Sequence, residues 1–273
     1  MYAFPILALA LLGASPSPKQ GVLLRRTFAP NFAAKYRLES KGETKTAMPN
    51  GMADMEMTVT SSMDLAQRVV KVAADAKSAD LESKMTNIVF DLQSPMGTPP
   101  GAQMPKEIVV TQTTDELNRV TNIKSSYAAA NPFEGDQTMA GLGGIFSFPS
   151  KQVAIGESWD VETPETTMMK KGKATTTLIG EKDEKGTPVW VLGVKAELPL
   201  KLDSAKMAST AGAPPMNITG TVHFTGEVEV LKSDGSLFSM NLKAATDTEI
   251  EIESAGITLH SSGTSSSTMT RVP

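Results

Sequence analysis

The stretch "TDTEIEIES", residues 246–254, decides the fold class. Within it, glutamate alternates with isoleucine over residues 249–253. Successive side chains of a β-strand point to opposite faces, so this alternation gives a strand with one charged face and one apolar face. The stretch therefore predicts a half-buried strand of an antiparallel sheet.

The same period of two recurs along the chain, and Gly, Asp, Asn and Pro separate the alternating segments. These segments are KYRLES (35–40), MEMTVTSSM (55–63), KEIVVTQT (106–113), KATTTLIG (173–180), VWVLGVKAELPLKL (189–202) and ITGTVHFTGEVEVL (218–231). Residues 64–76, DLAQRVVKVAADA, also fit a helical face, but their β-branched valines favour a long bent strand with a turn near 75–78.

An approximate internal repeat supports this reading. FAAKYRLE (32–39) matches IGESWDVE (155–162) in its order of apolar, small, aromatic and acidic residues. In each half a proline-rich loop, a strand and a turn that starts with aspartate follow in the same order. We therefore expect a mainly β protein, an antiparallel meander in two similar halves. Long strands in one sheet accumulate twist, which favours a strongly curved sheet such as an open barrel or clam.

The expected organisation has four parts. Residues 1–18 form a signal peptide, 19–130 the first β repeat, 131–150 a connector and 151–273 the second repeat, the two repeats forming one structural unit. The only helix expected is a short one in the connector, over residues 137–146. Its "GLGG" lacks the preceding strand and the lysine of a phosphate-binding loop.

Composition narrows the function. The 273 residues carry a net charge of −4, so the chain lacks the basic surface that nucleic acid needs. There is no cysteine, which excludes thiol catalysis, cysteine-ligated zinc and a lipid-modified cysteine anchor. The N-terminal sequence "MYAFPILALALLGAS" joins a short apolar run to small residues, as in a secretory signal. We expect an exported protein, periplasmic or extracellular, without a transmembrane segment in its mature form.

The segment "FPSKQVAIGESW", residues 148–159, follows a glycine-rich connector and precedes "GEKDEKGTPVWVL" and "SDGSLFSMNLK". In these features the chain resembles a family of uncharacterised bacterial secreted or envelope β-sheet proteins with a Phe-Pro…Val-x-x-Gly-x-x-Trp motif. That resemblance implies an envelope location, often as a lipoprotein, and carries no catalytic residues. This chain departs from many members of that family because it lacks the lipid-acceptor cysteine.

Candidate binding residues are aromatic and sulfur-containing. If the curved sheet encloses a cavity, its expected lining is Trp159, Tyr36, Phe146, Phe148, Met55 and Met57. The alternative reading of these residues is a packed core at the junction of the two halves. Met52, Met55 and Met57 also suit Cu(I), with His223 or His260 completing the site, although Met55 and Met57 stand two apart as on a core-facing strand.

Catalytic constellations are sparse. Two histidines occur in the chain, and neither lies in a nucleophile or metal motif. The "GTSSS" at 263–267 lacks the second glycine of a nucleophile elbow. The sequence thus predicts a non-enzymatic exported protein without a cofactor, which binds a lipid, another hydrophobic ligand or an envelope protein through a concave face. The alternatives are a Cu(I)-handling protein and an interaction protein with no small ligand.

Overall fold

The computed structural model describes residues 21–49, 52–95, 105–126, 146–163, 165, 169–203 and 216–273. In these ranges the chain forms one antiparallel sheet of eleven strands. The strands are β1 (Ala33–Thr46), β2 (Met55–Val72), β3 (Ser78–Gln93), β4 (Glu107–Asp115), β5 (Val120–Ser125), β6 (Ser158–Thr163), β7 (Gly172–Glu184), β8 (Thr187–Asp203), β9 (Met216–Leu231), β10 (Leu237–Ile252) and β11 (Ile257–Val272). A 3-10 turn, η2 (Glu253–Ala255), joins the last two strands.

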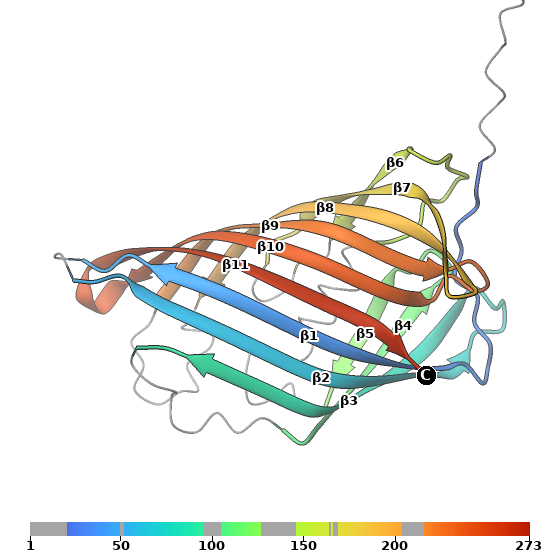
Figure 1. Ribbon diagram of the computed structural model, residues 1–273, viewed down its shortest axis with the longest axis horizontal. Coiled ribbons are helices and arrows are strands. Elements are labelled where there is room, and N and C mark those ends of the chain that lie inside the picture. The colour runs from blue at the N-terminus through green and yellow to red at the C-terminus, as the bar shows by residue number, and fades with distance from the viewer. Residues whose placement is uncertain are drawn as a thin grey trace, which may run out of the picture.

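The strand order places the start and the end of the chain together at the centre of the sheet. That order is β5-β4-β3-β2-β1-β11-β10-β9-β8-β7-β6. The chain runs outward from β1 to one edge at β5, resumes at the opposite edge at β6, and returns inward to β11. Both halves therefore share one strongly curved sheet, and in the described ranges its edge strands, β5 and β6, do not pair with each other (Figure 1). The expectation of a mainly β, antiparallel, curved and open meander is confirmed.

The ambiguous segment at 64–76 is also settled. It continues β2 to Val72 and ends in a turn, with register shifts against β3 near Ser62 and Val69. Such irregularities bend a strand, as its β-branched residues had indicated. The helix expected at 137–146 lies outside the described residues except for Phe146, and the signal peptide expected at 1–18 lies wholly outside them.

The two faces of the sheet differ sharply. We call the face that carries Tyr36 and Leu38 the inner face, because both side chains lie in the main hydrophobic core. The outer face carries surface ion pairs such as Arg37 with Asp64 at 2.8 Å and Arg68 with Glu82 at 2.8 Å. Exposed pairs of this kind contribute little to stability. Most of the stability that side chains on the sheet contribute therefore comes from apolar burial on the inner face.

One end of the curved sheet is closed by the segment before β1, residues 21–32. The amide of Arg26 donates to the Glu116 carbonyl at 2.8 Å, in the β4–β5 turn. The amide of Thr27 donates to the Asp234 carbonyl at 2.9 Å, in the β9–β10 turn. The segment thus ties together turns that belong to the two halves of the chain. We call this region, at the right of Figure 1, the closed end.

The segment 148–159 fastens this closure to β6 and β7. The amide of Phe148 donates to the Leu117 carbonyl at 2.8 Å, and the Pro149 carbonyl accepts a bond from the Arg25 guanidinium at 2.7 Å. Gly156 turns the chain with φ at 88°, and its amide donates to the Leu178 carbonyl at 2.7 Å. The indole of Trp159 then donates to the Ser147 carbonyl at 2.7 Å. Phe148, Pro149, Gly156 and Trp159 of this motif therefore each hold the backbone of the closed end in place.

Candidate functional site

The inner face changes character along the strands. Near the closed end it is packed, whereas toward the far ends of the strands its apolar side chains are partly exposed. We call this second region the distal inner face, defined by Met55, Met57, Phe90, Ile218, Ile250 and Leu259. On β9–β11 it is continuous, because Ile250 lies opposite both Ile218 on β9 and Leu259 on β11, whereas the row beside Met55 contains Thr46 on β1 and Ser261 on β11. Phe90, on β3, is 42% exposed.

Small side chains occupy the middle of the same face. On β1 and β11, Ser40 lies opposite Ser267, and Gly42 lies opposite Ser265. These residues leave little bulk between the larger apolar residues on the strands to either side. On β1 and β11, small and mostly polar residues thus lie between the packed closed end and the distal inner face.

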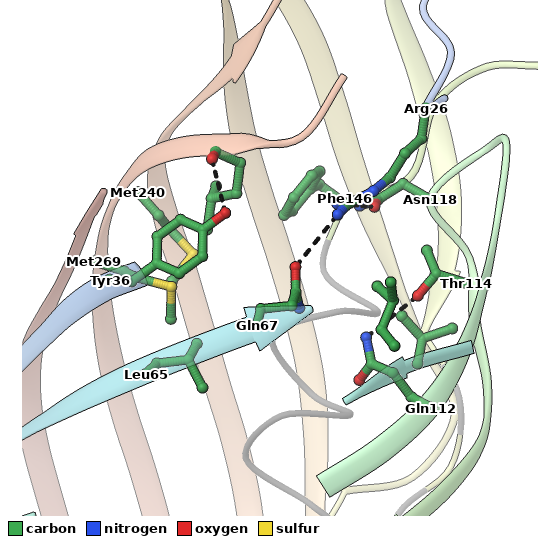
Figure 2. A pocket seen from close by; sticks show the side chains of 13 residues that line it. Arg26, Tyr36, Leu65, Gln67, Gln112, Thr114, Asn118, Phe146, Met240 and Met269 are labelled. Carbon is green, nitrogen blue, oxygen red and sulfur yellow. Dashed lines mark hydrogen bonds between the residues drawn. The ribbon is translucent and has the colours of Figure 1, made fainter. Parts of the chain in front are cut away.

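A cavity of about 80 Å³ lies at the closed end, between β1–β4, the β4–β5 turn, β10 and β11 (Figure 2). Its apolar side is formed by Leu65, Met240 and Met269, together with Phe146. Its polar side carries Arg26, Gln67, Gln112, Thr114 and Asn118. A cavity of this size exceeds by several-fold the roughly 10–15 Å³ that one water molecule requires by a comparable measure.

Arg26 is the most unusual of these residues. Its side chain is buried, with 7% of the residue exposed. The guanidinium donates to Asn118 Oδ1 at 3.4 Å and to Gln67 Oε1 at 3.3 Å, and its Cζ lies 5.7 and 5.6 Å from the ring centroids of Phe28 and Phe32. Burial lowers the pKa of Arg26, while Tyr36 and Asp234 oppose that shift. Among the described carboxylates, none forms an ion pair with it.

Gln112 adds an unsatisfied polar atom to the same cavity. It lies on the inner face of β4 and is 8% exposed. Its Nε2 donates to Thr114 Oγ1 at 3.3 Å, but its Oε1 is buried without a hydrogen-bond partner. A buried acceptor without a partner costs about 1–3 kcal/mol. This group therefore indicates a place for an additional polar partner.

Tyr36 closes the cavity from β1. It is 2% exposed, and its hydroxyl donates to the Leu237 carbonyl at 3.1 Å. Burial raises the pKa of this phenol, and the positive charges of Arg26 and Arg271 oppose the rise. The hydroxyl is thus held protonated beside a buried guanidinium.

The six residues expected to line one cavity divide into two groups. Tyr36 and Phe146 line the closed-end cavity, while Phe148 and Trp159 pack in the same core without lining it. Met55 and Met57 lie on the distal inner face. Met57 pairs with Thr44 and Leu65 with Tyr36, so Met57 stands eight residues from the cavity along β2, about 26 Å at 3.3 Å per residue. The structure therefore does not bring all six residues together at this cavity.

The histidines lie apart from the methionines. Met55 and Met57 occupy the inner face, whereas His223 and His260 lie on the outer face beside Glu197 and Glu249, each at 3.6 Å. Met52 precedes β2 and is 53% exposed. Because the sheet separates the two residue types, neither histidine can complete a copper site with the β2 methionines.

The outer face also has a depression of about 500 Å³ across β1 and β9–β11. Its floor is made of small residues such as Ala245 and Ser266, and Lys41, Lys243 and His223 stand around it. Small and charged side chains of this kind are typical of a strand face that is exposed to solvent. We therefore place the candidate site on the inner face.

Sequence reasoning missed Arg26 and Gln112. Gln112 carried a usable signal, because it follows Ile108 and Val110 on the inner side of an alternating strand and so stands at a core position. Arg26 carried no such signal, because residues 21–32 show no hydrophobic periodicity and a pair of adjacent arginines usually lies on the protein surface.

Comparison of the chain with known protein families and with characterised proteins finds no match to either. The fold and the site must therefore be interpreted from their own chemistry. Within the described ranges, no helix is long and apolar enough to cross a bilayer.

Proposed function

We propose that this protein is an exported, non-enzymatic binding protein that holds a hydrophobic ligand on its distal inner face. The observation that carries the proposal is the group of partly exposed apolar side chains on the concave side of the sheet, of which Ile218, Ile250 and Leu259 form a continuous row across β9–β11. Contiguous exposed apolar surface is characteristic of sites that bind ligands or partners. The unbranched side chains of Met55 and Met57 can adapt to ligands of different shape.

The chemistry of the described residues supports binding rather than turnover. The Arg26 guanidinium at the closed end donates to Asn118 and Gln67, and outer carboxylates such as Asp64 and Glu82 pair with arginine. Export is proposed from the apolar N-terminal run and the small residues that follow it.

Binding of N-phenyl-1-naphthylamine, a neutral probe whose fluorescence rises in apolar surroundings, tests this function. The matched variants are Ile250→Gln on the inner face and Glu251→Gln at the next position, on the outer face. We expect Ile250→Gln to weaken probe binding at least fivefold and Glu251→Gln to leave it within twofold, with both proteins folded by circular dichroism.

Native mass spectrometry of protein purified from its own host gives a second readout. We expect a co-purified ligand that denaturation releases. Ligand-free protein that also fails to bind the probe would exclude a small hydrophobic ligand and favour an envelope protein as the partner of this face.

A further inference from the structure

We infer that the closed-end cavity binds a small cluster of ordered water molecules, which donate to Gln112 Oε1 and accept from the Arg26 guanidinium. The inference does not depend on the proposed function, because the cavity lies apart from the distal inner face and its ligand is polar. It assigns the cavity a neutral ligand that carries both hydrogen-bond donors and hydrogen-bond acceptors.

The carboxamide of Gln112 requires a partner that can donate a hydrogen bond. Gln112 is 8% exposed, lines the cavity and donates from Nε2 to Thr114 Oγ1 at 3.3 Å. Its Oε1 is buried and has no partner among the described residues. An amide oxygen only accepts hydrogen bonds, so an anion cannot satisfy it, whereas water can. Water also suits the other orientation of this amide, because a half-turn that exchanges Oε1 and Nε2 only reverses the direction of the bond.

Arg26 requires acceptors in the same cavity. Its side chain is buried, and a buried charge is costly unless an opposite charge or hydrogen bonds compensate it. The two described acceptors of the guanidinium, Asn118 Oδ1 and Gln67 Oε1, are neutral amide oxygens at 3.4 and 3.3 Å, which is long for a bond of this kind. A guanidinium has five N–H donors, so water in the cavity can accept from those that remain. The positive charge of Arg26 also disfavours a cation such as ammonium, which could otherwise donate to Gln112.

The size of the cavity fits several water molecules. Its volume is about 80 Å³, and one water molecule requires roughly 10–15 Å³. Internal water of this kind occupies polar sites in which two to four groups can bond to it. In Figure 2, Gln112, Thr114 and Asn118 lie at the right of the cavity and Met240 and Met269 at the left, so we place the water against the polar side. The cluster thus connects the segment before β1, which carries Arg26, with Gln112 on β4.

Magnetic relaxation dispersion of oxygen-17 in water tests the inference, because it counts water molecules that stay inside a protein for longer than the protein takes to tumble. The variant Gln112→Met replaces the cavity-facing amide with an unbranched side chain of similar length. Gln93→Met is the matched control, because it makes the same change at an exposed position on β3. We expect the unchanged protein and Gln93→Met to hold the same number of internal waters, and Gln112→Met to lose at least one of them. No internal water in the unchanged protein, or equal numbers in all three proteins, would overturn the inference.

Thermal unfolding of the same variants gives a second readout with a definite sign. If the cavity were dry, Oε1 of Gln112 would destabilise the folded protein, and Gln112→Met would raise the Tm. With water bound, Gln112→Met removes a satisfied amide together with a partner of the water, so we expect a lower Tm. Gln93→Met should leave the Tm unchanged. A higher Tm for Gln112→Met would contradict the presence of water.

A crystal structure of the unchanged protein supplies a test that needs no variant. We expect a water oxygen within hydrogen-bond distance of Gln112 Oε1, at about 2.7–3.0 Å. An organic molecule at this position, or no bound molecule at all, would overturn the assignment to water.

Discussion

Val22 and Val153 form an isolated antiparallel bridge in which each amide donates to the other's carbonyl, at 2.7 and 3.0 Å. The bridge joins the segment before β1 to the segment before β6. It therefore connects the central strand of the sheet with the strand at one edge, which no pairing within the sheet does.

The bridge predicts that Val153 matters for stability. Val153 is 1% exposed, so Val153→Ala should lower the free energy of unfolding by about 2 kcal/mol, from lost apolar burial and the space left behind. Ile155 is 48% exposed, and Ile155→Ala should cost well under 1 kcal/mol. Urea unfolding of the two variants measures the difference, and equal costs would show that the closure does not contribute.

From the backbone conformation of Gly156 we predict a loss of stability on substitution that does not depend on packing. Its φ is 88°, and a Cβ added there would meet no atom within 4 Å. Gly156→Ala should therefore destabilise the protein by about 1–2 kcal/mol through conformation alone. Gly180 has equally open space and no positive φ, so Gly180→Ala should be close to neutral. Thermal unfolding distinguishes the two, and similar shifts in Tm would contradict the conformational explanation.

Gly226 predicts a steric effect. A Cβ at this position on β9 would lie 2.1 Å from the Asn241 carbonyl oxygen on β10, so the strands would have to separate. We expect Gly226→Ala to cost about 1–3 kcal/mol or more, as overpacking does. At Gly42 the nearest atom would be 3.4 Å away, and Gly42→Ala should be tolerated. Chemical denaturation of both variants provides the comparison.

Tyr36 predicts an alkaline dependence of stability. Burial raises the pKa of its phenol above the usual value, so the folded state prefers the neutral form. This contribution is complete below the pKa of the unfolded chain, near 10, and is lost as the pH rises toward the higher pKa of the folded state. We expect Tyr36→Phe to make stability less sensitive to pH above about 10. It should also cost about 1 kcal/mol at neutral pH through the lost bond to Leu237.

Urea unfolding of Tyr36→Phe and the unchanged protein, at intervals from pH 8 to 11, measures this effect. A parallel decline in the two proteins would contradict it. The absorbance of ionised tyrosine near 295 nm should show a phenol that titrates late in the folded protein and at the ordinary pH in urea.

The strands could be predicted because their side chains alternate. Glu249 is exposed and Ile250 partly buried, as the period of two requires. The central pairing of β1 with β11 could not be predicted from the sequence, because "SSGTSSST" at 261–268 lacks the large apolar residues that indicate a buried face. Its face is set instead by register, which places Ser267 opposite Ser40 and Met269 opposite Leu38.

The candidate site was less accessible to sequence reasoning than the fold. Aromatic and methionine residues mark a core and a ligand surface equally well, and Tyr36 and Met57 prove to lie at different ends of the inner face. The polar part of the site depends on contacts between distant segments, such as Arg26 with Asn118 and Gln67, that local patterns do not encode.

The pairing of the first and last strands also determines the order in which the protein can be completed. β1 meets β2 through a local hairpin, but its other neighbour, β11, is the last of the described strands in chain order. Contacts so distant in sequence form slowly, because a long loop must close before they contribute. Until β11 is made, β1 and β10 each have an unpaired side, and no pairing within the sheet joins β1–β5 to β6–β10. A chain that stops after Ile252 would therefore hold two incomplete sheets in place of one.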